Sequence, residues 1–172
     1  MNLTTEKIIG TKFEIWLETY FKSKGCLNVR RNVEFHKSRY LYRQADLTFS
    51  LNSNGNEKLI IVEAKYSSNG PIKYDLRQGF KFKAGSNIIT NLVDEIIERQ
   101  KFVGAYSSIL VTNKYFDDRL RQEAAKQNVL LFDRERLFAD YKRLGGNYSN
   151  LEKSINAIDV YRYDLNKHII KI

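Results

Sequence analysis

Three charged side chains, Asp46, Glu63 and Lys65, have types and a spacing that suit hydrolytic chemistry. Residues 45–51 alternate polar and apolar side chains, which is typical of a strand, and Asp46 lies on the polar face at its start. Glu63 and Lys65 end the largely apolar run 58–65 and are two residues apart, so they project from one face of a second strand. Paired carboxylates favour Mg²⁺, which prefers hard oxygen ligands.

The turn between these two strands decides whether the acids meet. Asn54 and Gly55 form the strongest hairpin signal in the chain. A hairpin there lays the strands antiparallel and brings Glu63 close to Asp46 at one edge of the sheet. Glu14 on the first helix is a candidate third carboxylate, if that helix packs beside the sheet. A metal ion held there would activate water, and the neighbouring lysine would orient the water or stabilise charge on a phosphate.

An ordinary structural explanation of the same residues stays open. Charged residues are common at strand ends, and a short motif is only a hypothesis. A carboxylate that ends an apolar strand is costly unless it is paired. Lys65 alone could pair with Glu63 and satisfy it.

Several other chemistries lack their residues. No Gly-rich loop leads to Lys-Ser or Lys-Thr, and no GxSxG motif is present. His36 and His168 are the only histidines, which disfavours histidine-based catalysis and HExxH zinc sites. The single cysteine excludes an intrachain disulfide.

The composition indicates a folded, basic protein. The chain has 172 residues, which suits one domain, and its net charge of +9 points to a polyanionic partner such as nucleic acid. Its longest apolar runs are too short to span a bilayer, so no membrane partner is expected. The first 14 residues carry four charged side chains and no uninterrupted apolar core, which predicts a cytoplasmic protein without a secretory signal.

Basic and aromatic side chains cluster in two segments around the acidic residues, and we expect them to contact phosphates. A solvated basic loop is the competing explanation. The candidates are Arg30, Arg31, Lys37, Arg39, Tyr40, Tyr42, Arg43, Lys73, Arg77, Lys81 and Lys83.

The remaining pattern predicts the elements that position this site. Expected helices cover residues 5–24, 91–106, 117–127 and 133–143, and expected strands cover 26–35, 45–51, 58–65, 107–112 and 129–132. Residues 66–89 read as a loop with a short helical piece, Gly145-Gly146-Asn147 as a break, and residues 148–172 as one helix and one strand. This order predicts a mixed sheet with helices on both faces.

Motif order and spacing resemble the PD-(D/E)XK nuclease superfamily, and within it the Mrr-like restriction endonuclease domain, which is related to Holliday junction resolvases. The resemblance rests on Glu14 in Gly10-Thr11-Lys12-Phe13-Glu14, Asp46 in Gln44-Ala45-Asp46, and Glu63-Ala64-Lys65. It continues through Ile109-Leu110-Val111-Thr112-Asn113 and Val129-Leu130-Leu131-Phe132-Asp133. Ala45 stands where many members have proline, and Glu63 where many have glutamine.

The resemblance implies an α/β restriction-endonuclease-like fold, a mixed αβββαβ core in residues 1–144, with residues 145–172 as a C-terminal extension packed on the same domain. It implies hydrolysis of DNA phosphodiesters that leaves 5′-phosphate and 3′-hydroxyl ends. The implied cofactor is Mg²⁺, for which Mn²⁺ can substitute, held by Asp46, Glu63 and Glu14, with Lys65 supporting the nucleophile.

Three functional hypotheses follow. The leading one is a metal-dependent DNA endonuclease of restriction or junction-resolving type, working as a homodimer because cutting both strands needs two sites. The second is a nucleic-acid-binding module that does not cut. The third is a nuclease subunit whose partner protein supplies the choice of target.

Overall fold

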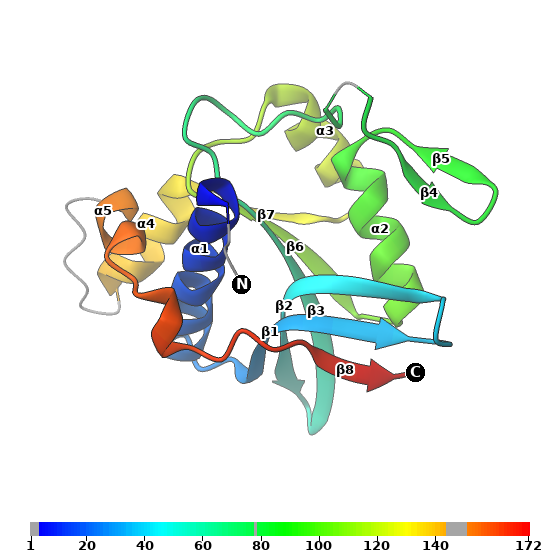
Figure 1. Ribbon diagram of the computed structural model, residues 1–172, viewed down its shortest axis with the longest axis horizontal. Coiled ribbons are helices and arrows are strands. Elements are labelled where there is room, and N and C mark those ends of the chain that lie inside the picture. Colours follow the sequence, from blue (N-terminus) through cyan, green and yellow to red (C-terminus); the bar gives the residue numbers. More distant parts are fainter. Residues whose placement is uncertain (1–3, 78, 144–150) are drawn as a thin grey trace.

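A mixed six-stranded sheet forms the centre of the described chain (Figure 1). The computed structural model describes residues 4–77, 79–143 and 151–172. The strand order is β7-β6-β3-β2-β1-β8. Strands β1, β2 and β3 form an antiparallel meander, whereas β6 pairs in parallel with β3 and β7, and β8 pairs in parallel with β1.

The elements follow the predicted order. The sheet strands are β1 (Leu27–His36), β2 (Tyr42–Ser53), β3 (Asn56–Lys65), β6 (Ser107–Thr112), β7 (Leu130–Phe132) and β8 (His168–Lys171). The helices are α1 (Thr5–Ser23), α2 (Leu92–Val103), α3 (Asp118–Lys126), α4 (Arg134–Arg143) and α5 (Leu151–Asn156).

Helices cover both faces of the sheet, as the pattern predicts. One apolar cluster joins α1, α4 and α5 to the sheet, and it contains Phe13, Leu17 and Val62. The other joins α2 and α3 to the opposite face, and it contains Ile61 and Ile96. Because Ile61 and Val62 are consecutive in β3, this strand is buried from both sides, which explains its apolar sequence. The α/β fold with a helix-flanked mixed sheet is therefore confirmed.

The predicted loop over residues 66–89 was only partly right. Strands β4 (Phe82–Ala84) and β5 (Asn87–Ile89) form a small separate hairpin, and no described residue between β3 and α2 is helical. The two-residue connection Gly85-Ser86 explains the tight turn, because Gly85 adopts a φ of 60°. Strands of three residues are too short to show an alternating pattern.

The C-terminal segment lies along the meander. Helix α5, a 3₁₀ turn η1 (Val160–Arg162) and strand β8 agree with the predicted helix and strand. The Lys167 ammonium contacts the Glu34 carboxylate at 2.5 Å, and β8 pairs with β1. The predicted break at residues 145–147 lies outside the described residues, and the division into 1–144 and 145–172 stays a prediction.

Candidate active site

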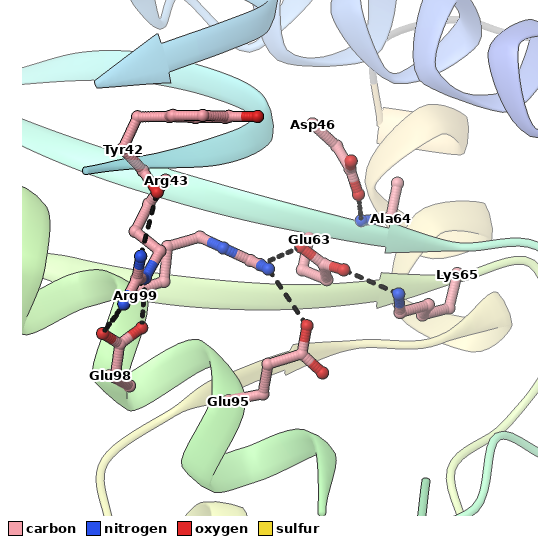
Figure 2. Close-up of polar contacts among 9 residues, drawn as sticks. All are labelled: Tyr42, Arg43, Asp46, Glu63, Ala64, Lys65, Glu95, Glu98 and Arg99. Carbon is pink, nitrogen blue, oxygen red and sulfur yellow. Dashed lines mark hydrogen bonds and ion pairs between the residues drawn. The ribbon is translucent and has the colours of Figure 1, made fainter. Parts of the chain in front are cut away.

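The β2–β3 hairpin brings Asp46 and Glu63 to the same edge of the sheet. Asn54 and Gly55 connect the strands with φ angles of 53° and 82°, the left-handed conformations that a two-residue hairpin turn requires. The register pairs Leu47 with Val62, so the residues beside this pair are Asp46 and Glu63. Asp46 Oδ2 accepts a hydrogen bond of 2.8 Å from the backbone N–H of Ala64 (Figure 2).

Glu63 is buried between two cations. Its side chain is 7% exposed; Oε1 lies 2.6 Å from Lys65 Nζ, and Oε2 accepts a hydrogen bond from Arg99 Nη1 (Figure 2). Burial alone would raise the pKa of Glu63, but Arg99 and Lys65 hold it below its ordinary value. Glu63 therefore stays ionised, and the predicted pairing with Lys65 accounts for only part of its compensation.

Helix α1 adds Glu14 to this group. Its neighbours Phe13 and Ile15 are buried in the core, which fixes the helix against the sheet and leaves Glu14 half-buried. Burial, followed by the charge of Asp46, raises the pKa of Glu14 to about 8. Burial, followed by the charge of Glu63, raises the pKa of Asp46 to about 7. The two carboxyls lie close enough to repel each other and Glu63.

Sequence reasoning missed two site residues, Glu95 and Arg99. Both lie on α2, and Arg99 Nη2 donates to Glu95 Oε1 at 3.1 Å. A signal was present in the sequence: Glu95 and Arg99 fall three and seven residues after Leu92, inside the stripe that faces the sheet. A charged pair on a buried helix face needs a charged partner opposite, and Glu63 is that partner.

The group contains more carboxyl groups than cations. Four carboxylates, those of Glu14, Asp46, Glu63 and Glu95, interact with one another around the Lys65 ammonium and the Arg99 guanidinium. Neither Glu14 nor Asp46 forms an ion pair with another described residue. An added cation would relieve this repulsion, so the oxygen donors fit Mg²⁺.

The described residues hold no preformed cluster of three metal-binding side chains. This agrees with how Mg²⁺ usually binds, through one or two carboxylates with water and substrate phosphates filling its other positions. Asp46 and Glu63 offer two such carboxylates.

Most of the predicted phosphate-contacting residues are exposed, but two are engaged within the fold. Arg31 is buried and pairs with Glu18, and Arg43 contacts Glu98 at 2.7 Å. Tyr42 stacks on His36. The exposed members are Arg30, Lys37, Arg39, Tyr40, Tyr42, Lys73, Arg77, Lys81 and Lys83.

The two basic segments flank the C-terminal half of α2. The β1–β2 turn and the β4–β5 hairpin project toward the same side of the molecule (Figure 1). Their bases meet around Arg43, whose guanidinium lies 5.3 Å from the Phe82 ring and 4.7 Å from the Phe102 ring. Lys37 Nζ also lies 4.4 Å from the Phe102 ring. An aromatic and cationic cluster therefore ties both segments to the helix that carries Arg99.

A family model described as a restriction endonuclease, Mrr_cat, matches residues 5–139. The chain belongs to the Mrr-type restriction endonuclease family. The match includes Glu14, Asp46, Glu63 and Lys65, as well as helix α2. The resemblance inferred from the sequence motifs is thereby confirmed. No curated protein matches the chain.

Two solved structures are similar in fold to this Mrr-type chain. A protein of unknown function, AF1548, has a TM-score of 0.52 and 13% identity, and the alignment covers 78% of this chain and 67% of AF1548. The DNA modification-dependent restriction endonuclease AspBHI has a TM-score of 0.51 and 14% identity, with 91% of this chain and 39% of AspBHI covered. The chain thus spans well under half of AspBHI, and these identities support the fold alone.

None of the described helices is long and apolar enough to cross a membrane.

Proposed function

We propose that this protein is a metal-dependent DNA endonuclease that hydrolyses phosphodiester bonds. The observation that carries the proposal is the meeting of Asp46, Glu63 and Glu14 beside Lys65, with more carboxylates than cations, in a chain of the restriction endonuclease family. Such a concentration of carboxyl groups is costly to the fold once they ionise, and a cation that binds there would explain it.

Asp46 and Glu63 would hold Mg²⁺, or Mn²⁺ in its place, with Glu14 as the third carboxylate. The bound ion supplies an activated water and stabilises negative charge on the phosphoryl oxygens. Lys65 contributes a second, permanent positive charge. Glu63, followed by Asp46 and opposed by burial, raises the pKa of Lys65, so its ammonium stays protonated and can orient the water or bind a phosphate oxygen.

DNA is the proposed substrate, cut to give 5′-phosphate and 3′-hydroxyl ends. The net charge of +9 and the two basic segments support a phosphate backbone as the ligand. An open hollow of about 370 Å³ at the β1–β2 turn is lined by Lys37, Arg39 and Lys171, among others. Tyr40 on the same turn is 85% exposed and offers a ring on which a base can stack.

Duplex and branched DNA are both consistent with this surface. Cleavage of both strands calls for two active sites, so the proposal includes a homodimer on the DNA. A partner protein that selects the target is the alternative route to specificity. AspBHI, which acts on modified DNA by its name, is more than twice the length matched here.

A nucleic-acid-binding module without catalysis is the second candidate. One observation favours it: both carboxylate oxygens of Glu63 are already engaged, by Lys65 and by Arg99. An acid fully satisfied by protein cations has less need of a metal ion.

Cleavage of a supercoiled plasmid and of a synthetic four-way junction tests the proposal. Both substrates are incubated with Mg²⁺, with Mn²⁺ or with EDTA. Wild type should cut only with a metal ion, and Asp46→Asn should not cut. Glu57→Gln is the matched control, because Glu57 lies on the same strand as Glu63 but is exposed at the far end. Binding without cutting by wild type, with either metal, would favour the second candidate.

A further inference from the structure

Arg99 bridges two carboxylates that come from different elements. Its guanidinium donates through Nη1 to Glu63 on β3 and through Nη2 to Glu95 on α2, the latter at 3.1 Å (Figure 2). All three residues are buried, with at most 8% of each exposed. Two buried carboxylates that face a shared cation are also the donor arrangement of a divalent metal site.

The guanidinium differs from a metal ion because it is attached to the helix. Its presence beside the two carboxylates therefore does not depend on the concentration of any ion. Its Nε has no hydrogen-bond partner among the described residues. The ion pairs with the Glu63 and Glu95 carboxylates therefore compensate the burial of the Arg99 side chain, although its hydrogen bonding is incomplete.

The rest of the site is not neutralised in this way. Asp46 and Glu14 form no ion pair with a described residue, although Asp46 is near enough to feel the charges of Lys65 and Arg99. Arg99 therefore pairs with Glu63 and Glu95, and Lys65 with Glu63, whereas the carboxyls of Asp46 and Glu14 have no cation paired with them among the described residues.

We propose that Arg99 occupies the place of a second metal ion, so that the site binds one divalent cation on the side of Asp46 and Glu14. The proposal rests on the proposed function and deepens it. Arg99 is then a positioning residue, because it fixes the Glu63 carboxylate and does not itself contact the substrate.

Counting bound Mn²⁺ ions on the full chain tests this inference, by equilibrium dialysis or by the electron paramagnetic resonance signal of free Mn²⁺. Wild type should bind one ion. Arg99→Met should bind two, because Glu63 and Glu95 then lack their shared cation. The double variant Arg99→Met/Glu95→Gln should return to one ion.

Two further variants separate this effect from general destabilisation. Arg99→Lys keeps a fixed positive charge and should still bind one ion. Arg136→Met is the matched control, because Arg136 pairs with Asp140 at the same four-residue spacing on another helix, and it should also bind one. If Arg99→Met is unfolded in EDTA, addition of Mn²⁺ should refold it, and this rescue should disappear with Glu95→Gln.

The outcomes distinguish the two claims. Two ions on wild type would overturn the role of Arg99 and leave the metal-dependent nuclease standing. No ion on wild type would overturn both. A folded Arg99→Met protein that binds a single ion, or an unfolded one that Mn²⁺ does not rescue, would reduce Arg99 to a structural contact.

Discussion

Replacing Asp46 with asparagine should stabilise the metal-free protein. Burial and the charge of Glu63 raise the pKa of Asp46 from 3.8 to about 7, so its ionised form is penalised in the folded state. That difference corresponds to about 4 kcal/mol once the carboxyl is ionised. Asparagine can still accept the hydrogen bond from Ala64, and the raised pKa already includes the effect of that bond on the ionised form. The expected gain is therefore about 4 kcal/mol at pH 8.

The gain should depend on pH with a definite sign. A carboxyl whose pKa is higher in the folded than in the unfolded state loses stability as the pH rises between the two values. The difference between Asp46→Asn and wild type should therefore be absent near pH 4, grow up to about pH 7 and remain constant above it. Mg²⁺ should stabilise wild type at pH 8, and the variant much less, because the variant has lost a metal-binding carboxylate.

Urea unfolding in EDTA and in Mg²⁺, at acidic and alkaline pH, measures both effects. Asp75→Asn is the matched control, because the Asp75 side chain is 69% exposed. The free energy of unfolding of this variant should differ little from that of wild type. The reasoning is refuted if Asp46→Asn is less stable than wild type in EDTA at pH 8. It is also refuted if Mg²⁺ stabilises both proteins equally.

Three other changes test separate parts of the account. Lys65→Met should abolish cleavage while sparing DNA binding in a filter-binding assay, because its charge acts on the reacting phosphate. Asp140→Asn should lower the free energy of unfolding in urea by about 2 kcal/mol at neutral pH. Burial raises the pKa of Asp140, but hydrogen bonds from Lys24 and other side chains outweigh burial and lower the pKa to about 2. That cost should fade as the pH drops from about 4 to about 2. Replacing Lys81 and Lys83 with alanine should weaken DNA binding and reduce its salt slope by about 2.

The core of the fold could be predicted because its signals are local. The Asn54-Gly55 turn, the alternation after Ala45 and the apolar stripe of α1 each fall within a few residues of the chain. The β4–β5 hairpin was missed because its strands are short. The partner of β8 was not predictable either, since its pairing with β1 joins segments that are more than a hundred residues apart.

The candidate site was predictable where one hairpin determines it. Register alone brings Asp46 to Glu63, and the two-residue spacing brings Lys65 to the same face. Arg99 was overlooked because the apolar residues of α2 were read as its only buried face. Its Glu95 partner shows that a charged pair can share such a face when a third charge lies opposite.

The internal pairing of two basic residues was also beyond sequence reasoning. Arg31 and Arg43 lie in a strongly basic stretch, and the stretch was read as a single phosphate-binding surface. Their carboxylate partners, Glu18 and Glu98, come from two different helices. Charge clustering along the chain therefore predicts a basic region but not which of its members are free to bind DNA.

The most direct test of the central claim compares DNA binding and cutting by wild type and Glu63→Gln in the same incubations. The substrates are labelled duplex and four-way-junction DNA, with Mg²⁺ or EDTA. Glu63→Gln removes a charge at the centre of the site and keeps the shape of the side chain. Both proteins should bind, and only wild type with Mg²⁺ should cut. Equal cutting by Glu63→Gln, or binding by wild type without any cutting, would contradict the central claim.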